Sequence, residues 1–275
     1  QVQTNKIRKE WQIMRIRRIS KRLICTALAL AMVMFLLPLQ IFTVTSATLN
    51  TTADVAEGTS SIYFDYAFTA GQSYKVTATW DSVPVFSGTQ MGYTLQTSDK
   101  TNPGDLIIKT INETTGMKSS AIHAYSGIFI PARNMTALEL SISGITAANK
   151  ITVTVEPATI EENVLFDGTI NLAADTTFSN TFFGLKIAQD SFYDINVAWT
   201  SVPQFNVSGT VWKLQPAASV MLEGNSAQQF AWIKSTNTDA EKQSYSGIGV
   251  QAAMDGDYLN FFTRKLKEAN SVHIT

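Results

Sequence analysis

The chain has 275 residues, an apolar content of 45% and a formal net charge of −1, which suits one large or two ordinary domains with a packed core. Eight Lys and Arg but only one acid, Glu10, fall within residues 1–47, so residues 48–275 carry a net charge of −8. Because so acidic a body repels nucleic-acid backbones, we expect no nucleic-acid partner.

The first segment, residues 1–22, is basic. Met14 begins a stretch with the proportions of an ordinary signal peptide, whereas the first residue is Gln1. Lys9-Glu10 is what a purine-rich ribosome-binding sequence would encode a few codons before a bacterial start. We therefore interpret residues 1–13 as translated leader, with a genuine cytoplasmic extension as the alternative.

The second segment, residues 23–47, is an apolar run that ends in small residues at Ala47. A basic flank, an apolar run and small residues are the parts of a secretory signal, which predicts cleavage after Ala47. Twenty apolar residues are also enough for an uncleaved anchor helix, in which case the membrane is a partner. Either way residues 48–275 are exported, to the outside or to the extracellular face of the envelope. Cys25 is the only cysteine, so no disulfide follows.

The remainder contains an internal repeat. Residues 74–86, YKVTATWDSVPVF, recur 119 positions later as residues 193–205, YDINVAWTSVPQF. Three further matches follow the same order at offsets of 119 to 121, and they indicate a tandem duplication: 48–54 with 169–175, 125–128 with 245–248, and 148–153 with 269–274.

The periodicity of both copies is that of strands. Apolar residues alternate with polar ones over 62–68, 74–80 and 138–143, and no sustained helical pattern follows residue 47. The fold class we predict is all-β, with two tandem β-sandwich modules of jelly-roll or immunoglobulin-like type after the N-terminal signal or anchor helix. The modules span 48–157 and 158–275. The last strand of the second stops at Thr275, so truncation is one interpretation.

Aromatic residues of the repeated motifs are the candidate ligand-binding residues. Trp80 and Trp199 would stack against sugar rings if they were exposed at a strand end. Their phase within the alternating strands instead favours the core. Tyr125 and Tyr245 in the two Tyr-Ser-Gly-Ile motifs are either binding aromatics or the starts of strands.

Motifs of catalytic or metal chemistry are missing from the sequence. The two histidines, His123 and His273, are not equivalent between the copies. There is no nucleophile elbow, no paired-histidine metal motif and no glycine-rich phosphate loop. We therefore expect no enzyme activity, no metal and no cofactor.

Residues 65–76, DYAFTAGQSYKV, resemble the opening strands of pre-peptidase C-terminal modules, which are β-sandwiches appended to secreted bacterial enzymes and surface proteins. In the second copy Asp190 replaces Gly71, and the acidic strand of that family has no clear match. The resemblance implies a non-catalytic accessory module for substrate or surface attachment.

These observations favour a non-catalytic secreted or cell-surface bacterial protein whose duplicated modules serve adhesion, surface display or glycan binding. A glycan or another cell-surface polymer is the expected partner, and duplication suits weak sites that gain avidity when linked. One alternative is the accessory N-terminal region of a larger secreted hydrolase. Another is a purely structural envelope subunit.

Overall fold

The computed structural model divides the chain into two compact units, residues 1–45 and 46–275. The basic region and the expected signal or anchor helix lie outside the described residues, while Ala47 is described and exposed. Within the described residues no helix is long and apolar enough to span a bilayer. The structure describes residues 47–275 except 89–90, 113–118, 121, 162, 175–178, 218–231, 237–242 and 253–255.

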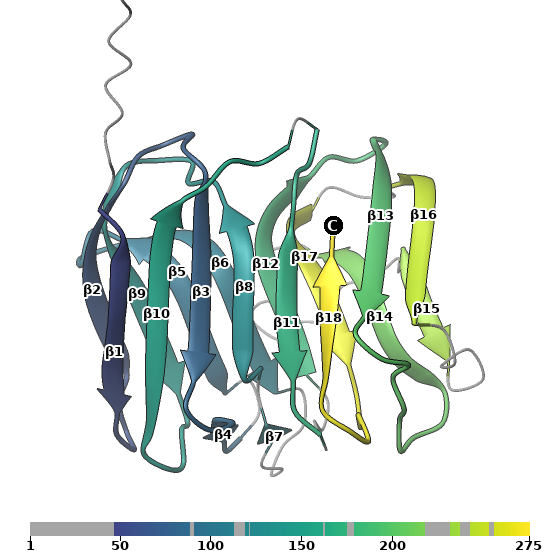
Figure 1. The fold of residues 1–275 in the computed structure, drawn as a ribbon, viewed down its shortest axis with the longest axis horizontal. Coiled ribbons are helices and arrows are strands. Elements are labelled where there is room, and N and C mark those ends of the chain that lie inside the picture. The colour runs from purple at the N-terminus through teal and green to yellow at the C-terminus, as the bar shows by residue number, and fades with distance from the viewer. Residues whose placement is uncertain are drawn as a thin grey trace, which may run out of the picture. The chain divides into compact units, whose positions relative to one another are not determined.

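The predicted all-β sandwich is confirmed. Eight antiparallel strands form one sheet, sheet A, which lies toward the viewer in Figure 1. In spatial order its strands are β1 (Leu49–Val55), β10 (Asn149–Pro157), β3 (Tyr74–Trp80), β8 (Ala124–Phe129), β11 (Gly168–Leu172), β18 (Asn270–Ile274), β13 (Phe192–Trp199) and β16 (Ser244–Gln251).

Eight further strands form the opposing sheet, sheet B, and two short strands, β4 (Val85–Phe86) and β7 (Ser119–Ser120), pair separately. In spatial order sheet B contains β15 (Ile233–Thr236), β14 (Thr210–Ala217), β17 (Gly256–Thr263), β12 (Ser179–Ile187), β6 (Pro103–Asn112), β5 (Gly92–Ser98), β9 (Met135–Ser143) and β2 (Ser61–Phe68).

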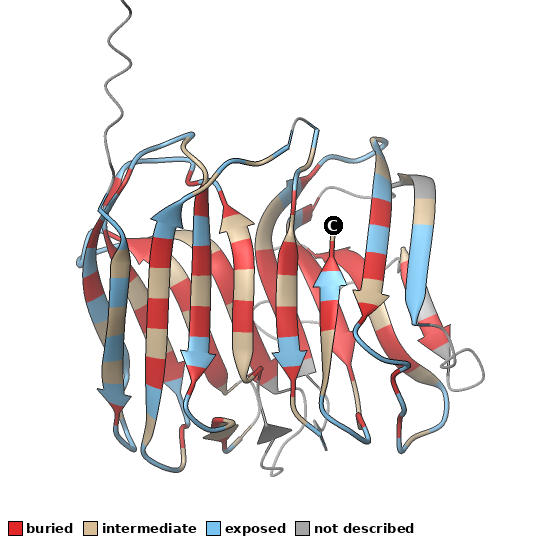
Figure 2. Cartoon of the chain, viewed as in Figure 1, coloured by how far each residue is buried: buried red, intermediate tan, exposed pale blue. Residues whose placement is uncertain are grey.

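The core lies between the two sheets because the side chains of each strand alternate between its faces. Along β3 the side chains of Tyr74, Val76, Ala78 and Trp80 are buried, and the residues between them face outward. Figure 2 shows these alternating bands along β3 and β10. The alternation over 62–68 and 138–143 is likewise buried on one face, as predicted from the sequence.

The strand order of each sheet falls into two similar sets. In sheet A the first-half strands (48–157) run β1-β10-β3-β8 and the second-half strands (158–275) run β11-β18-β13-β16. In sheet B, counted from its β2 end, they run β2-β9-β5-β6 and then β12-β17-β14-β15. The halves meet edge to edge, because β8 pairs with β11 and β6 with β12. Both sheets are therefore continuous across this junction.

Side chains from both halves pack together at the junction. Tyr125 on β8 stacks on Phe183 of β12, with ring centroids 6.1 Å apart. On the opposite side of sheet B, Ile111 of the first half packs with Phe182 and Ala217 of the second. The junction therefore buries apolar surface on both faces of sheet B.

An asparagine closes the same loop in each half. Asn149 donates its amide N–H to the carbonyl oxygen of Ser82 at 2.8 Å and accepts the N–H of Ser82 at 3.3 Å. Asn270 makes the same two hydrogen bonds with Ser201, at 2.9 and 3.3 Å. These contacts explain the repeated Ala-Asn pair, since the amide replaces backbone partners that the turn lacks.

The turn before β3 and the turn before β13 both need a left-handed residue. Gly71 has φ of 76° and Asp190 has φ of 61°. Aspartate tolerates this conformation better than most residues with a side chain. Asp190 therefore supports in the second half the same kind of turn that Gly71 supports in the first.

One of the matches drawn from the sequence is out of register. Strand pairing places Val55 opposite Asn149 and Leu172 opposite Asn270, so Val55 corresponds to Leu172. The sequence match of 48–54 with 169–175 rests on the similar, Thr- and Ala-rich composition of these segments, and it differs from the register that strand pairing gives. Short Thr- and Ala-rich segments carry too little pattern to define a register.

We expect Tyr74→Phe to lower the free energy of unfolding by about 1–2 kcal/mol and Tyr193→Phe by less. Each hydroxyl accepts a backbone N–H at 2.9 Å, from Thr69 and Ala188 respectively. Tyr74 is fully buried, whereas Tyr193 is partly exposed, so water replaces the lost acceptor more readily at Tyr193. Urea denaturation of both variants measures the difference, and an equal or larger loss for Tyr193→Phe contradicts it.

Candidate functional site

The two tryptophans considered as sugar platforms lie in the core. Trp80 is 1% exposed and Trp199 is 2% exposed. The ring of Trp80 packs edge-on against Tyr93 with centroids 5.4 Å apart, and that of Trp199 packs against Trp212 at 6.1 Å. Neither indole offers a free face to a sugar ring, so stacking on these residues is not supported, and packing is the interpretation that fits their positions.

The two motif tyrosines differ in exposure. Tyr125 is 2% exposed, and burial raises the pKa of its hydroxyl. Tyr245 is 37% exposed, because its strand β16 lies at the end of sheet A whereas β8 has a neighbour on each side. Each ring lies near the glycine two residues later: a Cβ atom at Gly127 would overlap the hydroxyl of Tyr125, and one at Gly247 would lie 3.2 Å from the ring of Tyr245. The repeated Tyr-Ser-Gly is thus a packing motif, and only Tyr245 retains exposed aromatic surface.

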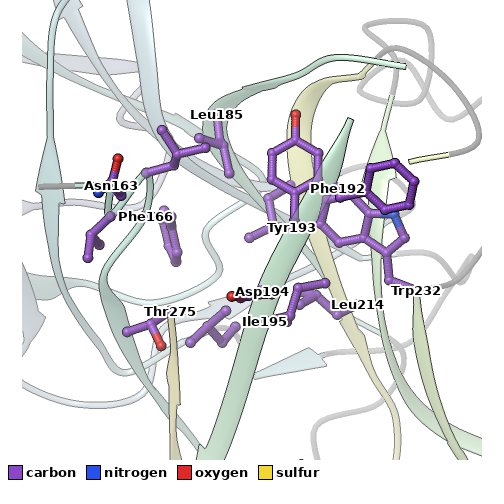
Figure 3. Close-up of a pocket in the computed structure, with 14 residues that line it drawn as sticks. Asn163, Phe166, Leu185, Phe192, Tyr193, Asp194, Ile195, Leu214, Trp232 and Thr275 are labelled. Carbon is purple, nitrogen blue, oxygen red and sulfur yellow. The ribbon is translucent and has the colours of Figure 1, made fainter. Parts of the chain in front are cut away.

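A cavity of about 430 Å³ opens elsewhere, at the end of the second half where β13 begins. Figure 3 shows the rings of Phe192, Tyr193 and Trp232 close together, with Asn163 and Leu185 across from them. Tyr193 and Trp232 stack with centroids 5.5 Å apart and an interplanar angle of 29°. Phe192 is 67% exposed, so an aromatic face is open to solvent at this cavity.

In the first half the corresponding space is filled by aromatic side chains. Tyr74, which corresponds to Tyr193, packs against Tyr66 at 5.8 Å and Phe68 at 5.2 Å. Phe68 in turn packs against Phe129 at 6.3 Å.

The second half has smaller side chains at these positions. A cavity forms where smaller side chains replace larger ones and the surrounding backbone does not move to fill the space. The register shifts at a bulge in both halves, between Asp65 and Phe68 on β2 and between Gly184 and Ile187 on β12. Strand pairing and this shared bulge give the correspondence: Leu185 for Tyr66, Ile187 for Phe68, and Val250 for Phe129.

Polar groups also line the cavity. Asn163, which lies across from the rings of Tyr193 and Trp232, lines the cavity together with Asp194. An apolar cavity of this size with a few polar groups is typical of small-ligand sites, which occupy roughly 300–1,000 Å³. The arrangement provides stacking surface for an apolar ring face and hydrogen-bond partners for hydroxyl groups.

Sequence reasoning did not identify Phe192, Trp232 or the cavity beside them. Phe192 precedes the inward stripe of β13 and faces outward, which is the signal that could have marked it. Trp232 directly precedes Ile233, which strand pairing aligns with Ile108 of the first half, so only a comparison of the two halves reveals it.

Metal ligands do not cluster in the part of the chain that the structure describes. No group of three or more His, Cys, Asp or Glu side chains there is placed to hold an ion. His273 contacts the carboxylate of Asp167 at 2.9 Å across the strand pair β11–β18, and both side chains are about half exposed.

Comparison with known proteins identifies no family, because neither a family model nor a curated protein matches the chain. Among solved structures the chain is similar to an F-lectin (fucolectin) from the serum of the striped bass Morone saxatilis, at 12% identity and a TM-score of 0.25, covering 81% of this chain and 84% of the lectin. It is also similar to the turret protein A223 of Sulfolobus turreted icosahedral virus, at 12% identity and a TM-score of 0.23, covering 83% and 96%. The PBSX exported protein XepA matches at 7% identity and a TM-score of 0.22, covering 84% and 87%. Likenesses at these TM-scores assign neither fold nor function to the chain.

Proposed function

We propose that this chain is a non-catalytic protein exported to the outside of a bacterial cell, where the cavity beside Phe192 binds a glycan. The observation that carries the proposal is the open aromatic face of Phe192 next to the stacked pair Tyr193–Trp232. Sugar rings present apolar C–H faces to aromatic rings and hydroxyl groups to polar neighbours such as Asn163 and Asp194. Both kinds of surface line the same cavity.

Export is supported by the sequence of the first 47 residues. A basic flank, an apolar run and the small residues that end at Ala47 make up either a cleaved signal or an anchor. In both cases the β-sandwich reaches the extracellular side.

The tandem duplication is part of the same proposal. Support comes from the equal strand order of the two halves, from the matched asparagine hydrogen bonds, and from the matched turns at Gly71 and Asp190. The second copy differs by carrying the opened aromatic cavity. Duplication of a module followed by change in one copy accounts for a scaffold in which aromatic rings fill, in one half, the space that the other half leaves open.

The test is glycan binding by the purified full chain, kept in mild detergent and screened on a glycan array. We expect Phe192→Ala to weaken binding of any glycan found by about tenfold or more, since loss of an aromatic contact removes roughly 1.5 kcal/mol. Phe192 is largely exposed, so this variant keeps its core.

The matched control is Val202→Ala. Val202 is also exposed, at 44%, and follows the far end of β13, outside the residues that line the cavity. Unchanged binding by this variant together with loss in Phe192→Ala supports the site. Absence of any glycan signal, or equal effects of the two substitutions, contradicts the proposal.

A further inference from the structure

The strands at the two ends of the β-sandwich correspond, in sheet order, to the strands on the two sides of its internal junction. Where the halves meet, β8 pairs with β11 and β6 with β12. The strands that correspond to β8 and β6 are β16 and β15, which stand at one end of the sheets. Those that correspond to β11 and β12 are β1 and β2, at the other end. Along the described strands these ends pair on one side only, and an edge strand of this kind can pair with a further strand.

The ends also expose the aromatic side chains that the junction buries. Tyr245 on β16 is 37% exposed, whereas Tyr125 at the same position of β8 is 2% exposed. Tyr63 on β2 is 42% exposed, whereas Phe182 at the same position of β12 is 1% exposed. Large aromatic surface at an edge strand is costly to leave in water, and a strand placed as in the junction would cover it.

We propose that the β15–β16 end of one copy of this chain binds the β1–β2 end of a second copy and so repeats the internal junction. The register follows from the junction, where Tyr125 lies opposite Ile170 and Ser126 opposite Thr169. In the corresponding register Tyr245 of one copy lies opposite Ala53 of the next, and Ser246 lies opposite Thr52.

The interface uses two different surfaces of the chain, so it does not close on itself as a two-fold dimer does. A head-to-tail contact of this kind adds copies in a row unless the rotation between them closes a ring. The product is a chain of modules with continuous sheets, in which each copy presents one aromatic cavity.

The charged side chains at the β1–β2 end are compatible with binding of the β15–β16 end of another copy. Asp54 forms an ion pair with Lys150 at 3.4 Å, and Asp65 forms one with Lys100, so both acids are already balanced. The strand that would face β1 is β16, which carries no charged residue, so no like charge meets Asp54 in this register.

Site-specific disulfide formation tests the proposal in full-length chains that carry Cys25→Ser and so lack other cysteines. Chains carrying Thr52→Cys are mixed with chains carrying Ser246→Cys and oxidised. Residues directly opposite each other on antiparallel strands have Cβ atoms roughly 4.5–5.5 Å apart, close enough for a disulfide after small adjustment. We expect a covalent dimer on a non-reducing gel from the mixture and none from either variant alone.

The control pairs Thr52→Cys with Ser244→Cys, which lies on the same face of β16 but two residues out of register. Its sulfur would stand roughly 7 Å further along the strand, beyond disulfide reach. Addition of Tyr245→Lys to the Ser246→Cys chain places a charge in the interface and is expected to abolish the dimer. No dimer from the in-register pair, or equal yield from the control pair, overturns the proposal.

Discussion

Replacement of Trp80 by alanine is expected to lower the free energy of unfolding by about 3–5 kcal/mol, the range for large aromatic side chains removed from a core. Trp80 is 1% exposed and packs edge-on against Tyr93 between the two sheets. Its removal leaves a cavity that strands held by their hydrogen bonds on both sides cannot close. Trp199→Ala is expected to have an effect of the same size, because Trp199 packs against Trp212 and Phe261. Urea denaturation followed by circular dichroism measures both.

Phe192→Ala is the matched control for these losses. It removes a large aromatic side chain that is 67% exposed, so we expect a loss below about 1 kcal/mol. Where Trp80→Ala fails to fold, Trp80→Phe leaves a smaller cavity and keeps the comparison measurable. A Trp80 variant as stable as Phe192→Ala would mean that the indole does not belong to the core.

The second large effect is expected for Gly184→Ala, at about 2–3 kcal/mol of lost stability. Gly184 lies on β12 at the junction, where a Cβ atom would overlap the backbone carbonyl of Leu106 on β6. Because the obstacle is backbone, the two strands have to move apart, and the pairing of Phe183 with Ile108 beside it is disturbed. Thermal unfolding of the variant measures the loss.

Asp65→Ala is the control for Gly184→Ala. Strand pairing and the shared bulge place Asp65 of β2 at the position of Gly184, but Asp65 lies at the end of sheet B and its side chain is 81% exposed. Removal of an exposed carboxylate paired with Lys100 changes stability by less than about 1 kcal/mol. Equal effects of the two substitutions would contradict close strand contact at the junction.

Much of the sandwich could be predicted from alternation alone. The stripe from Tyr74 to Trp80 and that from Leu138 to Ile142 face the core, because a strand with one buried face leaves a period of two in its sequence. The phase of Trp80 in the first of these stripes, and of Trp199 in the stripe that begins at Tyr193, favours packing over ligand stacking.

The continuity of the sheets across the two halves could not be predicted in this way. It depends on the pairing of β8 with β11 and of β6 with β12, which are contacts between segments far apart in the chain. No local period encodes such a partner. Gly184 reflects the pairing of β6 with β12, because a Cβ atom there would overlap the carbonyl of Leu106. A glycine indicates such a contact only when the neighbouring strand is known.

The aromatic cavity could not be predicted from the sequence either. It arises from differences in side-chain volume between positions that only the strand register aligns. Leu185 and Val250 are ordinary apolar residues in their own strands. They mark an opening only by comparison with Tyr66 and Phe129 in the first half.

The most direct test of the central claim is a crystal structure of the protein soaked with the glycan that binds best on the array. The proposal predicts a sugar ring lying against the ring of Phe192 beside Trp232, with hydroxyl groups within hydrogen-bond distance of Asn163 or Asp194. A glycan bound elsewhere on the sandwich, such as at the exposed edge around Tyr245, would contradict it.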